Sequence, residues 1–384
     1  MQKYIWPLLA LTLFSCKKNT EVLDVTNEKF NNPLSSGIDS AVHAAYLKHK
    51  DSVNTIGMSI GLYKNGKIYN YGYGETVKGN KTPPNEKTFF EIGSITKTYT
   101  AIATHLMLLE KKQTINQTIR ELLPDSIPVL QKEGVEVTFK HLLNHTSGIP
   151  YFPGNFDIFN TAEELAESIK IYDKNKLFSY LKQNPVSFKP GEFFEYSNTT
   201  YGLMGVLLEE HYKKSYSKIL QEKIFNPLSL SETKTLIEQT DLTRWSKGYE
   251  DGEPVSYLND WSVLAGSGVL KSTLHDVLKY GIANLMPPTG LLGEAIKQSH
   301  QVSYLPFSDA GRFKINGRLG WFQYINNEVP NSRFIFHNGS TGGFNSELFI
   351  STETKTVLVI LFNTRYTGSD RQGFIRDLHK IMLQ

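Results

Sequence analysis

The sequence predicts an α/β fold in which the two ends of the chain form one domain around a mainly helical region. Two strand-like segments with a hairpin signal between them occur between residues 55 and 73, and further strand-like segments fill the carboxy-terminal part of the chain. Between them, helical periodicity and long loops dominate. This order indicates a discontinuous domain, with an α/β part at about 36–93 and 300–384 and a helical part at about 94–299.

The composition is that of an ordinary globular protein. Of the 384 residues, 40% are hydrophobic and 21% are charged, which is enough apolar material for one large core or two fused smaller ones. The 41 basic and 38 acidic residues give a net charge of +3, without a basic stripe of the kind that nucleic-acid binding requires. We therefore expect a small-molecule or peptide substrate and no nucleic-acid partner.

The amino terminus predicts export. An apolar run of about ten residues, Ile5 to Phe14, is too short to span a bilayer and is typical of a signal peptide. Cys16, the only cysteine, follows this run and resembles the lipidated cysteine of bacterial lipoproteins, although Phe14 is bulkier than usual there. The alternative is a plain signal peptide in which Cys16 is incidental. We expect a signal peptide at 1–15, a polar tether at 16–35, and a lipid-anchored protein of the bacterial cell envelope, periplasmic or outer-membrane associated.

The elements of the amino-terminal part follow from local patterns. Apolar residues at helical spacing predict a helix over Ser36–His49. Thr55–Tyr63 and Ile68–Tyr73 read as strands, and the Asn65-Gly66 pair between them predicts a tight hairpin because both residues tolerate positive φ. A long amphipathic helix is expected from Ser94 to about residue 110.

The remaining elements alternate between helices and strands. Helices are expected at about 202–213 and 274–284, with proline and glycine in the loops between them. Near the carboxy terminus four strands and a closing helix are expected: Leu319–Ile325, Arg333–His337, Glu347–Ile350, Thr356–Phe362 and Gln372–Leu383. The fourth strand is continuously apolar, which indicates a central place in the sheet.

Ser94-Ile-Thr-Lys97 is the first candidate for chemistry. Positions i and i+3 share one face of a helix, so the Ser94 hydroxyl and the Lys97 amine can meet there. A lysine whose pKa is lowered by burial can take the proton of the serine and activate it as a nucleophile. The motif alone is weak, since Ser-x-x-Lys occurs five times in the chain. Only Ser94 follows a glycine and precedes a long amphipathic helix.

Two further motifs are also weak when taken alone. In Tyr196-Ser-Asn198, a tyrosine can relay a proton and an asparagine amide can hold a substrate carbonyl, although Asn198 can equally cap the next helix. In the run from His337 through Gly339 and Ser340, glycine lets the backbone approach a ligand, and the Ser340 N–H suits an oxyanion hole. A glycine-rich turn between two strands is the alternative for this run.

Together, Ser-x-x-Lys, Tyr-x-Asn and His-x-Gly in this order resemble the serine β-lactamase and penicillin-binding protein superfamily. The branch that matches contains the class C β-lactamases, DD-carboxypeptidases and related esterases. Four flanking runs add to the resemblance, which extends from about Ser36 to the end of the chain: 90–97, 142–150, 265–270 and 319–321. The resemblance implies an antiparallel sheet flanked by helices and an acyl-enzyme mechanism without a cofactor.

The resemblance also implies a role for each motif residue. Ser94 matches the acylated serine, Lys97 its activator, Tyr196 the proton relay and Asn198 the contact to the substrate amide. The backbone N–H groups of Ser94 and Ser340 match the oxyanion hole. These roles favour a hydrolase over the alternative of a penicillin-recognising sensor or binding lipoprotein with little turnover.

His337 stands where many β-lactamases carry lysine. A neutral imidazole suits an uncharged ester or amide better than a carboxylate, so we expect weak β-lactamase activity and better hydrolysis of small esters or peptide amides. We also expect carboxylate-bearing substrates to gain as the pH falls from 8 to 6 and the imidazole becomes charged. The aromatic side chains that follow Gly148 are candidates for a cleft wall: Tyr151, Phe152, Phe156 and Phe159.

His141 and His145 raise the question of a zinc site. They have the i, i+4 spacing of a zinc-protease helix, but the glutamate that should follow the first histidine is absent. Ser147-Gly148 also interrupts the helix directly afterwards. We therefore expect no metal, and packing in a loop is the simpler interpretation of these two histidines.

Overall fold

The computed structural model describes residues 30–157, 160–256, 260–309, 313–329, 332–365, 368 and 370–384. The predicted signal peptide, Cys16 and most of the predicted tether lie outside the described residues, as does Phe159. Within the described residues, no helix has both the length and the apolar character needed to cross a membrane.

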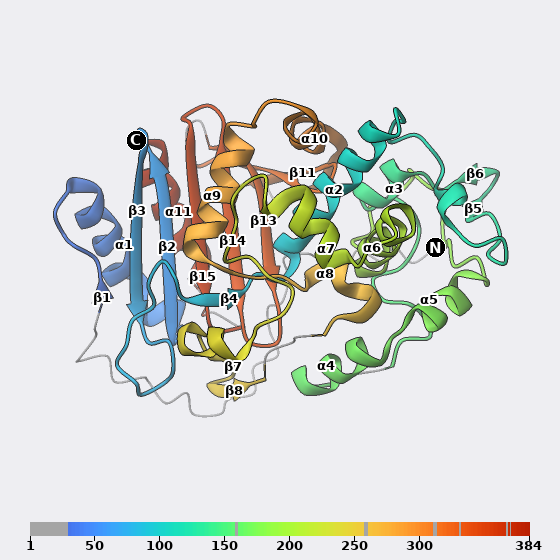
Figure 1. Ribbon diagram of the computed structural model, residues 1–384. Coiled ribbons are helices and arrows are strands. Elements are labelled where there is room, and N and C mark those ends of the chain that lie inside the picture. The colour runs from blue at the N-terminus through green and yellow to red at the C-terminus, as the bar shows by residue number, and fades with distance from the viewer. Residues whose placement is uncertain are drawn as a thin grey trace.

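A large antiparallel sheet forms the centre of the fold (Figure 1). In the described part of the chain it has nine strands, and each pair of neighbours runs antiparallel. In sheet order these are β1 (Phe30–Asn31), β3 (Lys67–Gly74), β2 (Gly57–Lys64), β15 (Thr356–Phe362), β14 (Asn345–Ser351), β13 (Arg333–Ser340), β12 (Phe322–Asn326), β11 (Phe313–Arg318) and β10 (Val302–Asp309). The sheet is built from both ends of the chain, so the predicted fold class is confirmed.

Helices and the loops between them surround this sheet. They are α1 (Gly37–Val53), α2 (Thr96–Glu110), α3 (Phe139–Leu143), α4 (Ala162–Ile171), α5 (Lys174–Leu181), α6 (Asn198–Tyr212), α7 (Tyr216–Leu220), α8 (Ala265–Gly268), α9 (Leu274–Leu285), α10 (Leu291–Ser299) and α11 (Arg371–Leu383). Short strand pairs lie outside the main sheet: β4 (Phe89–Glu91) with β9 (Lys271–Thr273), β5 (Gln131–Lys132) with β6 (Val135–Glu136), and β7 (Gly248–Glu250) with β8 (Glu253–Val255).

Strand β15 joins the two ends of the chain, because it pairs with β14 on one side and β2 on the other. Its side chains alternate between two separate hydrophobic cores. Val357, Val359 and Leu361 belong to the core shared with α9, whereas Leu358 and Ile360 belong to the core shared with α1 and α11. A strand buried on both faces reads as a continuous apolar run, and the predicted interior position of this strand is confirmed.

The rest of the molecule packs around α2, at the end of the sheet away from α1 (Figure 1). Helix α2 contacts α6, α8 and α10, and its residues from 96 to 108 are all buried. Helix α9 packs across β15, β14 and β2, on the face opposite α1 and α11. The segment between the two parts of the sheet therefore supplies both a helical body and a helix that covers the sheet.

Several predicted elements are confirmed, and others differ in detail. The hairpin turn has Asn65 and Gly66 at φ values of 53° and 77°, the left-handed conformation that the pair predicted. The strand expected at Leu319 begins instead at Phe322, because Arg318 N–H donates to the Trp321 carbonyl at 2.9 Å and closes a turn. The edge strand β10 and its neighbour β11 were not predicted.

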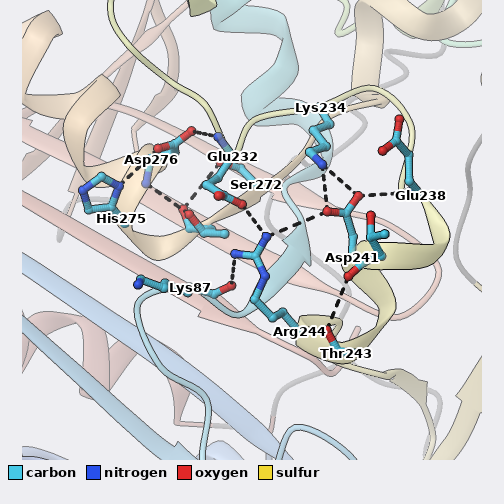
Figure 2. A network of polar contacts seen from close by, with 12 residues as sticks. Lys87, Glu232, Lys234, Glu238, Asp241, Thr243, Arg244, Ser272, His275 and Asp276 are labelled. Carbon is cyan, nitrogen blue, oxygen red and sulfur yellow. Dashed lines mark hydrogen bonds and ion pairs between the residues drawn. The ribbon is translucent and has the colours of Figure 1, made fainter.

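A polar network lies beside β9 and the start of α9 (Figure 2). Strand β9 lies between β4 and Lys234, which exchanges two backbone hydrogen bonds of 2.9 Å with Lys271. Lys234 Nζ donates to Asp241 at 2.7 Å, and Arg244 pairs with Glu232 at 2.7 Å. The backbone bonds hold β9 in place, and the side-chain network, in which Asp241 is buried, ties the segment that follows Lys234 to it.

Candidate active site

A tight turn between β4 and α2 presents Ser94. The turn is a short 3₁₀ segment, Gly93–Ile95, and the α-helix begins only at Thr96, two residues later than the sequence predicts. Gly93 has φ +48°, and a Cβ atom added there would lie 2.8 Å from the backbone nitrogen of Ser340. Only glycine therefore allows this turn and the end of β13 to come so close.

Lys97 lies in the first turn of α2 with its amine directed at Ser94. Its Nζ is 3.0 Å from Ser94 Oγ, 2.7 Å from Asn198 Oδ1 and 2.7 Å from the carbonyl oxygen of Ser267 in α8. The side chain is fully buried. Helices α2, α6 and α8 thus meet at this single nitrogen.

The surroundings of Lys97 favour the neutral amine. Burial holds the pKa of Lys97 well below its usual range, and no carboxylate of the described residues forms an ion pair with it. The contacts agree with this charge state. Asn198 Oδ1 and the Ser267 carbonyl only accept hydrogen bonds, so Nζ donates to both, and a neutral amine then has its lone pair left for the Ser94 hydroxyl.

Tyr196 lies just before α6 and next to Lys97. Its ring centroid is 4.8 Å from Lys97 Nζ. Burial raises the pKa of the Tyr196 phenol well above its usual value, while a hydrogen bond with Ser94 acts in the opposite direction. The phenol is therefore protonated at neutral pH and is hydrogen-bonded to Ser94, whose Oγ is in turn 3.0 Å from Lys97 Nζ.

Asn198 is the first residue of α6, which Ser197 caps by accepting the N–H of Thr200 at 3.1 Å. The capping residue is thus Ser197, and the Asn198 side chain is left for the site. Its amide lies between Lys97 and the side chain of Tyr151, which is also hydrogen-bonded to it. Tyr151 O accepts the backbone N–H of Asn198 at 3.0 Å, so the two residues are fixed side by side.

The end of β13 brings the third motif to the same place. An added Cβ on Gly339 would lie 2.1 Å from the carbonyl oxygen of Ile92, and Ser346 Oγ donates to that same oxygen at 2.9 Å. The sheet is thereby held directly against the turn that carries Ser94. The backbone of Ser340 thus lies beside Gly93, the residue directly before Ser94, and an oxyanion hole would need the N–H groups of Ser340 and Ser94 close together.

His337 is buried on β13 and is uncharged. Its Nδ1 is 2.6 Å from the carbonyl oxygen of Asn338, so Nδ1 carries the proton and Nε2 is an acceptor. Burial, and then the neighbouring Lys97, lower the pKa of His337 to about 3. The expectation that this imidazole becomes charged between pH 8 and 6 is therefore wrong, because the pocket desolvates the ring.

The aromatic residues expected to line a cleft divide into two groups. Tyr151 is 49% exposed, and its ring centroid lies 6.0 Å from that of Tyr196, beside the site. Phe152 and Phe156 stack on one another at 4.6 Å and pack against the main core. Only Tyr151 among the described members presents a largely open aromatic surface at the site.

The structure thus brings all seven predicted site residues of the three motifs to one region. Two participants were missed. The Ser267 carbonyl is reached only through the tertiary approach of α8 to α2, and no local pattern marks a carbonyl as a ligand. The second is His145, whose ring accepts a hydrogen bond from the backbone of Ser197, next to Tyr196. His141 instead accepts one from the backbone of Thr138. Among the described residues, no three His, Cys, Asp or Glu side chains are grouped as metal ligands.

Comparison with known sequences gives a consistent result. The chain matches the Beta-lactamase family over residues 44–380. A protein named beta-lactamase from Yersinia enterocolitica is 26% identical over 347 residues, covering 82% of this chain and 84% of that protein. Protein flp from Staphylococcus aureus (strain NCTC 8325 / PS 47) is 28% identical over 311 residues, covering 80% of this chain but only 59% of that protein.

Solved structures show the same fold. The beta-lactamase/D-alanine carboxypeptidase from Pseudomonas syringae has a TM-score of 0.74 at 22% identity, covering 90% of this chain and 99% of that chain. A class C beta-lactamase mutant has a TM-score of 0.74 at 23% identity, covering 90% and 96%. The family match spans most of the chain and confirms the resemblance seen in the motifs. The chain belongs to the beta-lactamase family of serine hydrolases, and its fold is that of the class C enzymes.

Proposed function

We propose that this protein hydrolyses small esters or peptide amides in the cell envelope through an acyl-enzyme on Ser94, with Lys97 and Tyr196 moving the proton. The observation that carries the proposal is the Lys97 amine, which is fully buried, 3.0 Å from Ser94 Oγ and without a carboxylate partner among the described residues. An amine kept neutral beside a serine hydroxyl is a general base for that hydroxyl.

The proposed reaction has two halves. Lys97 Nζ takes the hydroxyl proton of Ser94 while Oγ attacks the substrate carbonyl carbon, and the N–H groups of Ser94 and Ser340 stabilise the oxyanion. The proton then passes through the Tyr196 phenol to the leaving group as its bond to carbon breaks. A water molecule attacks the resulting ester, gives its proton to the same pair of side chains and releases the acid with Ser94 restored.

Ser94 is expected to carry the covalent adduct of an active-site label. A fluorophosphonate should modify the protein once, and mass spectrometry should place the adduct on the peptide that contains Ser94. Ser94→Ala should abolish labelling, whereas Ser231→Ala, which removes the serine of another Ser-x-x-Lys sequence, should leave it intact. An adduct on another serine would refute the assignment. A fluorescent penicillin that stays attached for hours would instead favour a sensor with slow deacylation.

The substrate class follows from the uncharged His337. Cephalosporins and D-amino-acid peptides carry a carboxylate, and a neutral imidazole offers that group no charge. The names of the relatives include both β-lactamase and D-alanine carboxypeptidase, which supports amide hydrolysis in general. The open Tyr151 ring beside Tyr196 adds apolar surface for an uncharged substrate.

His337→Lys is expected to shift substrate preference toward carboxylates. A charged hydrogen bond contributes about 1.5–3 kcal/mol, so the ratio of kcat/KM for a chromogenic cephalosporin to that for a nitrophenyl ester should rise about tenfold or more. In the wild type this ratio should stay constant from pH 6 to 8, because the pKa of His337 is about 3. His337→Gln, which adds no charge, is the control. Efficient cephalosporin hydrolysis by the wild type, unimproved by lysine, would contradict the proposal.

Cys16 is proposed as the site of a lipid anchor, on the strength of its place directly after the apolar run of the signal sequence. Cys16→Ser should move the protein from the membrane fraction to the soluble fraction of the cell envelope. Hydrolase activity should be unchanged, because in the described part of the chain the sheet begins at Phe30 and the proposed catalytic residues lie still further along the sequence. Membrane association that survives this substitution would show that the cysteine is not the anchor.

A further inference from the structure

His145 holds the loop that carries Tyr196 at two points. Its backbone oxygen accepts the N–H of Glu195 at 2.8 Å, and its ring Nδ1 accepts the N–H of Ser197 at 3.1 Å. One residue is thus bonded to the neighbours of Tyr196 on both sides. These two bonds fix the backbone from which the phenol projects.

The ring of His145 also packs directly on the phenol. The ring centroids of His145 and Tyr196 are 4.4 Å apart, and the planes are inclined by only 28°. Tyr201 and Phe194 contact the same imidazole at 5.0 and 5.7 Å, and His145 is buried. The imidazole is therefore enclosed by aromatic side chains, and the Tyr196 ring has a fixed surface to rest on.

The charge of His145 suits this arrangement. Nδ1 accepts a hydrogen bond only when it is unprotonated, so the ring is neutral with its proton on Nε2. Burial, and then the nearby Lys97 and His337, hold the pKa of His145 well below its usual range. The ring therefore keeps its acceptor at neutral pH, and it places no positive charge near the neutral Lys97 amine.

The backbone conformation of His145 directs the following segment along the same loop. Its φ of 60° is left-handed, which is uncommon for a residue other than glycine. After this bend, Thr146 O accepts the N–H of Gly191 at 2.8 Å, and Tyr151 O accepts that of Asn198 at 3.0 Å. The bend at His145 thus aligns one continuous segment against the loop that carries Tyr196 and Asn198.

We infer that His145 is a positioning residue for Tyr196: its stacked ring and its Nδ1 hydrogen bond hold the phenol where it exchanges a proton with Ser94. The inference rests on the proposed function, because it requires Tyr196 to relay a proton. It goes beyond the packing role that the sequence suggested for His145.

The test is a double-mutant cycle between His145 and Tyr196, measured as kcat/KM for a nitrophenyl ester. His145→Phe keeps an aromatic ring but removes the acceptor, and His145→Asn keeps an acceptor and tolerates the left-handed backbone but removes the ring. Each should lower kcat/KM about tenfold or more, because misplacement of a catalytic group by about 1 Å can cost about 10²-fold. In the Tyr196→Phe background, the same substitutions should cost less than about twofold.

His141→Asn is the matched control. His141 lies one turn earlier, and its Nδ1 also accepts a backbone N–H, that of Thr138 at 3.2 Å. This variant should lower the melting temperature, because it removes a capping hydrogen bond at the start of α3. It should leave kcat/KM within about twofold. Equal losses from His145→Asn with and without Tyr196 would overturn the inference. A Tyr196→Phe variant with full activity would instead overturn the proton relay, and with it the proposed function.

Discussion

Lys97→Ala is expected to lower the rate of Ser94 acylation about 10²–10⁴-fold, the contribution typical of a general base. Three hydrogen bonds orient the Lys97 amine, and two of them are to groups that only accept, so its lone pair is directed at the Ser94 hydroxyl. The measurement is the pre-steady-state burst with a nitrophenyl ester, which separates acylation from deacylation. The double variant Lys97→Ala/Tyr196→Phe should acylate little more slowly than the slower single variant, because the rate losses of groups that act as a unit do not add.

Lys97→Arg distinguishes a base from a fixed positive charge. Arginine stays protonated at every accessible pH, so this variant should be as slow as Lys97→Ala if the neutral amine takes the proton. Thermal unfolding of each variant checks that the fold is retained. An arginine variant with near wild-type acylation, or losses from Lys97→Ala and Tyr196→Phe that multiply fully, would contradict a shared proton-transfer unit.

The second large effect is a loss of stability in mild acid. Burial lowers the pKa of His105 to about 4 and the pKa values of His300, His337 and His379 to about 3. In the unfolded chain the pKa is about 6.5. Because the folded pKa is the lower one, the stabilisation is complete above pH 6.5 and is lost as the pH falls toward 3. At pH 5 each of these histidines lowers the free energy of unfolding by about 2 kcal/mol relative to neutral pH. Together the four losses approach the whole stability of a typical domain.

His379 is the best single test of this acid effect. Among the described residues neither of its buried ring nitrogens has a hydrogen-bond partner, and the ring packs against Phe334 and Phe349 at 4.4 Å. His379→Phe should raise the urea midpoint at pH 7, because an unpaired buried polar group costs about 1–3 kcal/mol. The variant should also flatten the fall of the midpoint between pH 7 and 5. A wild-type midpoint that is constant from pH 7 to 5 would contradict the prediction.

Local chemistry made part of the fold predictable. The Asn65-Gly66 turn, the apolar stripe of α2 and the continuous apolar run of β15 each reflect forces that act within a few residues. Strands β10 and β11 lack such a signal. Strand β10 contains Pro306 and pairs with β11 through shifts in register, as suits an edge of the sheet.

The candidate site was predictable only as far as its motifs reach. Ser94, Lys97, Tyr196 and Asn198 could be named because their side chains carry the chemistry. The carbonyl of Ser267 and the ring of His145 enter the site only when distant segments meet. A backbone oxygen has no sequence identity, and a histidine after a short helix reads as packing until its neighbours are known.

The pairing of β2 with β15 has a consequence for how the chain folds. Tyr63 pairs with Val357, so the amino-terminal hairpin has no partner on its β2 side until nearly the whole chain is available. Contacts between such distant segments slow folding, and the open edge of β2 exposes unpaired backbone groups in the meantime. The pairing of β2 with β15 is therefore a late step in folding. A chain that ends before β15 would keep an aggregation-prone edge on β2 however well its helical body folds.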